Sequence, residues 1–297
     1  MMDQTINLDG ILRVSLMGGQ ARAFLIDSTR TVEEARRVHN LSRVATAALG
    51  RLLTGASVMG HMLKDERDSL TMTIKGGGEL GTLMAVAHAD GTVKGYVQNP
   101  DVELPLRADG KLDVGTAVGK KGQLTVIKDM GLKEPYVGMV NLQSGEIGED
   151  LAMYFTASEQ TPSLVSVGVL TNNTVIAAGG LIIQIMPGCT DIAIKSIEMS
   201  APMFMNISQT IHEFGLHGAY QQLLSHLEPE ILGVARPKYL CDCSRERFER
   251  GLISLGAEEL TTLINEDHGA ELSCHFCNRT FRFTEGQLRN LLEQAKR

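Results

Sequence analysis

The spacing of apolar residues predicts a long buried helix followed by a sheet in the first third of the chain. Thr31 and Glu34 have capping-box spacing at the start of residues 31–64, and apolar residues then recur at helical intervals. This stripe consists of Val38, Leu41, Ala45, Ala48, Leu52 and Leu53. Residues 70–100 instead alternate or cluster apolar side chains between turn signals, with a hairpin turn at residues 89–91. We therefore expect a helix followed by antiparallel strands.

Residues 142–235 predict a second helix, a strand pair and a helical connector. The stretch "LQSGEIGEDLAMYF" predicts a turn and a helix over residues 146–158, and a strand after it pairs with residues 174–186. Beyond Pro187-Gly188, residues 190–235 contain helical pieces and few strand signals. This connector carries the methionines Met199, Met203 and Met205.

The last part of the chain predicts a small domain of short elements. Ser244 can cap a helix that Gly256 ends, a second helix covers residues 258–264, and Thr284 with Gln287 makes a capping box before a final helix. Short strands lie between these helices. We predict an α+β fold in three parts: an N-terminal α/β core with an antiparallel sheet (residues 1–188), a helical linker (189–232) and a small C-terminal domain (233–297).

Composition is that of a soluble globular protein, with 43% hydrophobic and 21% charged residues among 297. The net charge is -7 and residues 231–297 are neutral, so the chain offers no cationic field for nucleic acid or an anionic membrane. Its first residues lack the basic start and apolar run of a signal peptide. The most apolar segment, "VIAAGGLIIQIMPG", is too short to span a bilayer. We therefore expect a cytoplasmic protein.

Several motif-like features predict no chemistry of their own. The string "GTAVGKKG" at residues 115–122 is one residue shorter than a phosphate-binding loop and lacks the Ser or Thr that holds magnesium, so we expect no nucleotide. His212 and His217 are five residues apart, whereas a helical zinc-protease site needs a spacing of four. Cys189 stands alone beside a turn, where a cysteine is more often a small buried residue than a ligand.

Four of the five cysteines are crowded into the last quarter of the chain. Cys241 and Cys243 form a Cys-x-Cys pair, and Cys274 and Cys277 form a Cys-x-x-Cys pair. A small fold can bring two such chelating halves together as a tetrahedral thiolate cage, for which zinc is the favoured metal. A domain of roughly sixty residues has a thin core, and a bound metal is a common way to stabilise it. We predict one zinc ion per chain, held by all four thiolates.

Other interpretations of the four cysteines stay open on spacing alone. A purely structural zinc ribbon has similar pairs, and a thioredoxin-like motif has the Cys-x-x-Cys half, although "CHFC" lies between short strands and not at a helix start. His268 or His275 could replace a cysteine, but four paired thiols leave no obvious vacancy. A disulfide between Cys241 and Cys243 would close a tight, easily reduced ring, which suits a reversible switch.

Long strings in both parts of the chain resemble one protein family. The C-terminal strings are "CDCSRERFERGLISLGAEEL" and "CHFC", and the strings before them are "EPYVGMVNLQSGEIGEDLAMYFTASEQTPS" and "GGLIIQIMPG". On these residues the chain resembles, over essentially its whole length, the thirty-three-kilodalton chaperonin family, the redox-regulated heat-shock holdases of bacteria. The resemblance implies the same three-part fold with a C-terminal zinc-binding domain.

The resemblance also implies a function, that of a non-enzymatic chaperone of the stress response. Such a protein binds unfolding clients without ATP and prevents their irreversible aggregation under oxidative and heat stress. The resemblance implies that the four cysteines hold zinc in the reduced, inactive state. Oxidants are then expected to expel the zinc, to pair Cys241 with Cys243 and Cys274 with Cys277, and to loosen the linker; the oxidised form can be a homodimer.

Two alternatives to the chaperone belong to other functional classes. The first is a zinc-ribbon regulator that binds nucleic acid, which the neutral C-terminal domain and the acidic remainder disfavour. The second is a thiol oxidoreductase, which would need turnover from the Cys-x-x-Cys pair without the other pair. An aggregation assay of reduced and oxidised protein separates all three.

Overall fold

Two compact units make up the computed structural model, which describes residues 9–295. They are Met1–Leu240, here called the body, and Cys241–Arg297, here called the module. Their helices and antiparallel sheets confirm the predicted α+β class. The boundaries predicted after residues 188 and 232 stay a prediction. The first eight residues, where the sequence predicts no signal peptide, lie outside the described residues.

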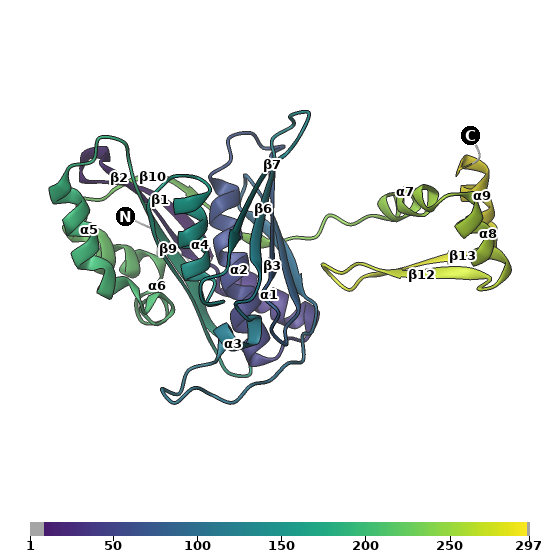
Figure 1. Cartoon of the computed structure of the whole chain (residues 1–297), viewed down its shortest axis with the longest axis horizontal. Coiled ribbons are helices and arrows are strands. Elements are labelled where there is room, and N and C mark those ends of the chain that lie inside the picture. The colour runs from purple at the N-terminus through teal and green to yellow at the C-terminus, as the bar shows by residue number, and fades with distance from the viewer. Residues whose placement is uncertain (1–8, 296–297) are drawn as a thin grey trace, which may run out of the picture. The chain divides into compact units, whose positions relative to one another are not determined.

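The body is built around two sheets (Figure 1). The first sheet has the strand order β10-β1-β2-β9-β8, and the second has the order β11-β5-β4-β3-β6-β7. Neighbouring strands are antiparallel except β11 and β5, which are parallel. In chain order the elements are β1 (Gly10–Leu16), η1 (Met17–Gly19), β2 (Ala21–Asp27), α1 (Thr29–His39), α2 (Arg43–His61), β3 (Ser69–Lys75), β4 (Thr82–His88), β5 (Thr92–Val97), α3 (Val114–Val118), β6 (Gln123–Asp129), β7 (Tyr136–Asn141), α4 (Gly148–Ala157), β8 (Ser163–Thr171), β9 (Val175–Ile185), α5 (Asp191–Phe204), α6 (Ile207–Leu224), η2 (Ser225–Leu227), β10 (Glu230–Ala235) and β11 (Lys238–Tyr239).

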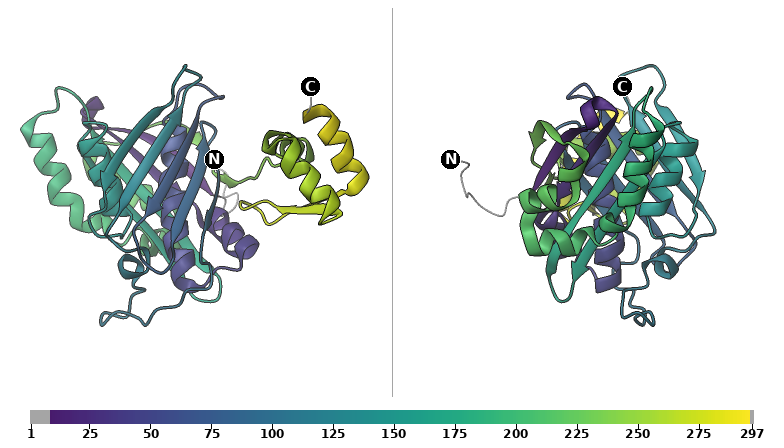
Figure 2. Two further views of the ribbon diagram at one scale, coloured as in Figure 1. Left: turned by 45° about the vertical axis from the view of Figure 1, so that its right-hand side comes forward. Right: turned by 90° about the vertical axis from the view of Figure 1, so that its left-hand side faces the viewer.

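Helix α2 lies between the two sheets and forms the centre of the larger core (Figures 1 and 2). It is buried on all sides from Val44 to Gly60 except at Arg51, as expected for a helix that is apolar around most of its circumference. Its glycines let neighbours approach closely: a Cβ atom on Gly55 would lie 2.6 Å from Leu151 Cδ1. The predicted hairpin at residues 89–91 joins β4 to β5, and Gly91 has the positive φ, 83°, that such a turn requires.

The helix predicted over residues 31–64 is in fact two helices. Helix α1 ends at Asn40, which adopts the left-handed conformation with a φ of 48°, and α2 begins after Ser42. The Ser42 hydroxyl oxygen accepts a hydrogen bond from the Ala45 N–H at 3.1 Å and caps α2. Apolar spacing continues across this break because both helices bury the same side against one core, so the spacing alone did not reveal the break.

The predicted capping box at Thr31 is wrong. Helix α1 begins at Thr29, so Thr31 lies inside its first turn. The carboxylate of Asp9 serves these first residues instead, accepting hydrogen bonds from the N–H groups of Arg30 (2.8 Å) and Thr31 (2.6 Å). A partner more than twenty positions upstream therefore replaces the local cap.

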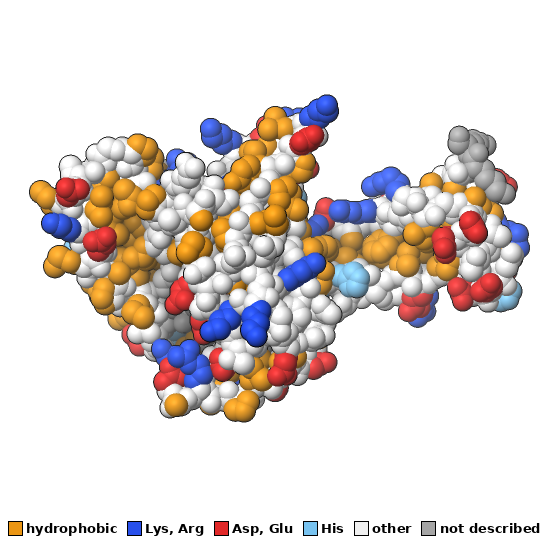
Figure 3. Space-filling view, viewed as in Figure 1, with side chains coloured by type: hydrophobic (Ala, Val, Ile, Leu, Met, Phe, Trp, Pro, Cys, Tyr) orange, Lys and Arg blue, Asp and Glu red, His pale blue; other side chains and the backbone are white. Residues whose placement is uncertain are grey.

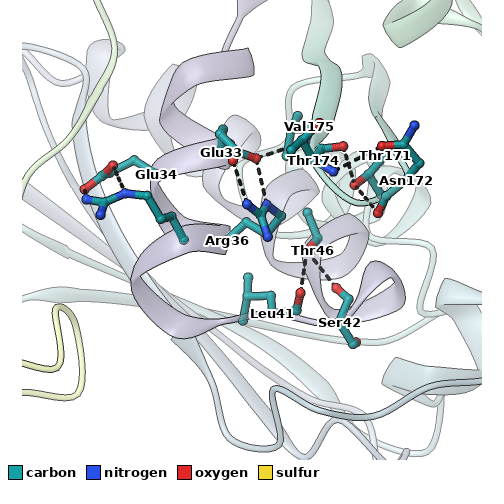
Figure 4. Close-up of polar contacts among 11 residues, drawn as sticks. Glu33, Glu34, Arg36, Leu41, Ser42, Thr46, Thr171, Asn172, Thr174 and Val175 are labelled. Carbon is teal, nitrogen blue, oxygen red and sulfur yellow. Dashed lines mark hydrogen bonds and ion pairs between the residues drawn. The ribbon is translucent and has the colours of Figure 1, made fainter.

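Glu33 joins α1 to the start of β9 (Figure 4). Its carboxylate accepts a hydrogen bond from the Val175 N–H at 2.9 Å and pairs with the Arg36 guanidinium at 2.7 Å. The hydrogen bond from Arg36 is the main cause of a lowered pKa of Glu33. The helix is thus fixed to the first sheet by polar contacts as well as by packing.

Helices α5 and α6 cover one face of the first sheet. Residues 191–224 are helical, apart from a short break between the two helices, as predicted. Both helices bury apolar side chains in the smaller core of the body together with residues of β1, β2 and β9. Its helical members are Ile197, Phe204, Ile207, Ile211, Ala219, Tyr220, Leu223 and Leu224.

The end of the predicted helical connector is a strand. Residues 230–235 form β10, which pairs antiparallel with β1. Local sequence gave little strand signal here, and pairing with an open sheet edge decided the conformation. Within residues 9–295, no helix is long and apolar enough to cross a membrane.

The described part of the module, residues 241–295, contains three helices and a hairpin. Its elements are α7 (Arg245–Leu255), α8 (Ala257–Asn265), β12 (Gly269–Ser273), β13 (Thr280–Thr284) and α9 (Glu285–Ala295). The predicted caps are confirmed: Ser244 Oγ accepts from the Arg247 N–H at 3.3 Å, and Thr284 and Gln287 bond reciprocally at 3.0 and 3.4 Å. The buried core consists of Leu252, Leu260, Ile264, Phe283, Leu288 and Leu291.

Candidate metal centre

Four cysteine side chains converge in the module. Cys241 and Cys243 lie in the segment before α7, and Cys274 and Cys277 lie in the turn between β12 and β13. Each Sγ atom lies within 4.8 Å of the other three. The fold thus brings together the four residues that the sequence singled out. Their role as zinc ligands stays a prediction.

Backbone hydrogen bonds shape the turn that carries Cys274 and Cys277. The Cys274 carbonyl accepts from the N–H groups of Cys277 (3.3 Å) and Asn278 (2.8 Å), and the Cys274 N–H donates to the Arg279 carbonyl at 3.0 Å. Asn278 has a φ of 56°, a conformation that asparagine tolerates better than most residues. These bonds close a tight turn, so the thiols at positions 274 and 277 are held near each other.

The sulfur atoms have the spacing of a tetrahedral thiolate site. The Sγ atoms of Cys241 and Cys274 are 3.7 Å apart, and those of Cys243 and Cys277 are 3.4 Å apart. Around a metal with bonds to sulfur of about 2.3 Å, tetrahedral ligands lie about 3.8 Å from one another. Both short distances join one cysteine of each pair, so the two pairs interleave. Four soft ligands fit a closed zinc site better than an open catalytic one.

The thiols bind their protons with unequal strength. Burial raises the pKa of Cys241 to about 11 and also raises the pKa of Cys243. Burial acts in the same direction on Cys277, but hydrogen bonds from the Arg279 N–H and the neighbouring thiols outweigh it and leave its pKa lowered. Since a metal binds the thiolate form, metal binding at such a cluster is coupled to proton release.

The other residues considered as ligands lie outside this cluster. Cys189 is partly exposed in the turn before α5, not buried as expected, and its Sγ lies 3.7 Å from the Thr190 carbonyl oxygen. The His217 ring stacks on Tyr220, and His268 lies 3.8 Å from the Glu285 carboxylate. Among residues 9–295, the four cysteines are the one group of three or more potential ligands close enough to hold a metal.

The glycine-rich string at residues 115–122 borders a cavity of about 600 Å³. Lys120 and Lys121 follow the C-terminal end of the short helix α3, whereas the lysine of a phosphate-binding loop lies at the start of a helix. Glu146 also lines the cavity and pairs with Arg107 at 3.3 Å and with Arg51 at 2.5 Å. This geometry differs from that of a phosphate-binding loop.

Sequence reasoning missed an anchor directly before the first cysteine. The hydroxyl of Tyr239 donates to the Gly95 carbonyl oxygen at 2.8 Å and lies 2.9 Å from His39 Nε2. The Leu240 N–H donates to the Val93 carbonyl oxygen at 2.9 Å. The chain is therefore fixed to the second sheet up to the last residue of the body. No local signal in the sequence indicates these partners, which lie more than a hundred positions away.

Sequence reasoning also missed an exposed apolar strip along β7 and the loop before it. Val137 and Met139 are 51% and 59% exposed, on the face of the sheet that α2 does not cover. Met130 and Leu132, in the loop before β7, extend this strip. Figure 3 shows apolar side chains along these strands. The signal available in the sequence was that β7 carries apolar residues at both sets of alternate positions. Val140 is on the buried face, so Val137 and Met139 had to face away from the core.

Known proteins resemble this chain over nearly its whole length. The family model described as "Hsp33 protein" matches residues 9–284. A 33 kDa chaperonin of Clostridioides difficile (strain 630) is 44% identical over 288 residues, covering 96% of this chain and 99% of that protein. A 33 kDa chaperonin of Acetivibrio thermocellus is 46% identical over 288 residues, covering 96% and 97%. The crystal structure of the 33 kDa chaperonin of Thermotoga maritima has a TM-score of 0.88 at 36% identity and covers 96% of this chain and 98% of that one.

The fold and the site define a class of protein with two units. One unit is an α/β body in which helices cover a sheet, and the other is a small module with four clustered thiols. The chain belongs to the Hsp33 family. Its relatives are named chaperonins and not enzymes, and the family supports a chaperone function with unfolded proteins as partners. The cysteine cluster is compatible with a metal ion and with redox regulation.

Proposed function

We propose that this protein is a redox-regulated holdase. In the reduced form it holds zinc and is inactive, and after oxidation and zinc release it binds unfolding proteins without ATP under oxidative and heat stress. The observation that carries the proposal is the cluster of four thiols in a module with few buried residues. We place it in the cytoplasm, where reducing conditions keep such thiols free until an oxidant appears.

Zinc bound to Cys241, Cys243, Cys274 and Cys277 would stabilise the module. Only six apolar side chains are buried in its core within the described residues. Structural zinc in small domains supplies about 10 to 16 kcal/mol, which equals or exceeds the total stability of an ordinary domain, about 5 to 15 kcal/mol. Loss of the metal would therefore unfold the module.

The metal-bound thiolates would also be the oxidant sensor. A peroxide oxidises a thiolate to a sulfenic acid, and a second thiol displaces water to form a disulfide. In the folded cluster, the short sulfur distances join Cys241 to Cys274 and Cys243 to Cys277. Once the module unfolds, closing a short loop costs less entropy than closing a long one. We therefore propose that the disulfides are Cys241–Cys243 and Cys274–Cys277.

The connection between module and linker supports a route for the signal. Tyr239 and Leu240 are bonded to the second sheet immediately before Cys241, and the edge strand β10 precedes them. If the module unfolded, this short segment would no longer be followed by a folded unit that holds its end in place. Loosening would then spread to β10, which is bonded on one side only, to β1.

Release of the linker would uncover a large apolar surface. Ile197, Phe204 and Ile211 on α5 and α6 are at most 4% exposed because they pack on the first sheet. Their release would expose both these side chains and the sheet residues beneath them. This surface would add to the strip along β7, which is already exposed. A contiguous apolar surface of this kind binds other exposed apolar chains, including unfolding clients or a second oxidised copy.

The test is an aggregation-suppression assay of the full-length chain, with zinc release followed in parallel. The reduced, zinc-loaded protein should leave a heated client to aggregate, and the protein treated with peroxide and mild heat should keep it soluble. Cys189→Ser is the matched control and should behave like the parent. Equal suppression by both redox forms, or activity that requires ATP, would contradict the proposal.

Peptide mapping of the oxidised protein tests the disulfide assignment. We expect the two pairs that are close in sequence, with Cys189 free. Cross-links that follow the short distances of the folded cluster would show instead that oxidation precedes unfolding.

A further inference from the structure

Helix α5 presents an apolar stripe to solvent in addition to its buried face. Ile192, Met199 and Met203 follow one another at intervals of seven and four residues, and they are 79%, 82% and 49% exposed. Met205, directly after the helix, is 77% exposed. The opposite side of the helix packs into the smaller core of the body. Figure 3 shows apolar side chains gathered over this part of the body.

The three methionine sulfur atoms on or beside this stripe differ from those of the core in their access to solutes. Met59 and Met72 are 2% and 0% exposed. A thioether is oxidised only where the oxidant can reach the sulfur, so side chains of one chemical type should react very unequally in this chain.

We propose that Met199, Met203 and Met205 form a second oxidation site, at which hypochlorous acid makes the exposed surface of the linker less apolar. The reaction is R–S–CH₃ + HOCl → R–S(O)–CH₃ + H⁺ + Cl⁻. Each sulfur loses two electrons and gains one oxygen atom, while chlorine is reduced to chloride. The product is a polar sulfoxide in place of a flexible apolar group.

The effect of this site on activity is opposite to that of the cysteines. Its functional consequence rests on the proposed holdase function, because it assumes that clients bind the apolar surface of α5. Oxidation of the four thiols would activate the protein, whereas oxidation of the methionines would make the exposed stripe of α5 polar. Thiolates are the stronger nucleophiles, so the activating reaction comes first as the oxidant increases. The protein would therefore be most active at an intermediate oxidant level.

The experiment titrates the reduced full-length chain with increasing hypochlorous acid. Mass spectrometry of peptides should find sulfoxides at Met199, Met203 and Met205 at doses that leave Met59 and Met72 unmodified. Aggregation suppression and the fluorescence of an apolar dye should rise at low doses and fall at high doses. The triple variant Met199→Leu, Met203→Leu, Met205→Leu keeps the stripe apolar and should retain its high-dose dye binding and activity.

A second variant, Met130→Leu with Met139→Leu, removes the exposed methionines of the β7 strip. At high doses of hypochlorous acid its activity should fall as that of the parent does. Sulfoxides that form no earlier on α5 than in the core, or a triple variant that loses dye binding and activity as the parent does, would overturn the inference. If the parent never suppresses aggregation after thiol oxidation, the holdase function fails instead, and the dye and the sulfoxide map still decide whether this site exists.

Discussion

The body and the module differ in what keeps them folded. In the body, α2 is enclosed by two sheets, and a second apolar core lies beneath α5 and α6. In the module as far as residue 295, six buried apolar side chains form the core between three helices and a hairpin, and four thiols are clustered beside them. A domain with so thin a core depends on an additional constraint. The comparison shows that the unit with the smaller apolar core is the one that carries the four clustered thiols.

The largest difference between the two units should appear on metal removal. Treating the reduced, zinc-loaded protein with a chelator should unfold the module and leave the body folded, because about 10 to 16 kcal/mol of metal binding is lost from the module alone. Hydrogen exchange should show lost protection in α7, α8 and α9 and unchanged protection in β9. Retained protection in the module would mean that its core suffices without metal.

A loosened linker should mimic oxidation. Phe204 is 0% exposed and attaches α5 to the first sheet. Phe204→Ala should weaken that attachment by about 3 to 5 kcal/mol, so the reduced protein should bind an unfolding client without losing zinc. Lys195→Ala, at an exposed position of the same helix, is the control and should stay inactive when reduced. If the variant still holds zinc and stays inactive, the cover over the first sheet is not what restrains activity.

Matched cavities in the two cores should have different consequences. Leu53 in the body and Leu260 in the module are both 0% exposed. Each change to Ala should cost about 2 to 5 kcal/mol. In the body the cost should lower the Tm. In the module, where we propose that folding and zinc binding are coupled, it should reduce the apparent zinc affinity by roughly 30-fold to several thousand-fold. Calorimetry and competition with a chelator measure the two effects. Unchanged zinc affinity in Leu260→Ala would separate metal binding from the module core.

The module was predicted from sequence better than the body because its elements depend on local signals. Ser244, Gly256 and the pair Thr284 and Gln287 act within a few residues of the helix ends that they define. The four cysteines were also found locally, from the short spacing within each pair. Neighbouring residues were therefore enough to predict most of the unit that contains the candidate site.

The body was predicted less well wherever a distant partner decides the structure. Asp9 replaces the capping box expected at Thr31, and β10 forms because β1 offers a free edge more than two hundred positions earlier. The same holds for Tyr239, whose partners His39 and Gly95 come together only in the folded sheet. Apolar spacing predicted the helices and strands but could not identify these long-range contacts.

Buried carboxyl groups give the body a weak pH dependence that the module does not share. Burial is the main cause of the raised pKa values of Asp9 and Asp27. A group with a raised pKa in the folded state contributes stability below its unfolded pKa, and this contribution is lost as the pH rises through the folded pKa. In the module, the hydrogen bond from Arg289 lowers the pKa of the exposed Glu285, so its contribution has the opposite sign and is lost as the pH falls.

Asp27→Asn should isolate this smallest effect. Asp27 Oδ1 accepts hydrogen bonds from the Thr29 N–H at 3.0 Å and from the Thr29 hydroxyl at 2.7 Å, and an asparagine Oδ1 can accept both. The variant keeps these bonds but never carries the buried charge. Its Tm for body unfolding should therefore exceed that of the parent near neutral pH, and the difference should shrink as the pH falls through the carboxyl range. Module unfolding should be the same in both proteins at every pH. A difference that stays constant with pH would show that the substitution acts through packing and not through the charge of Asp27.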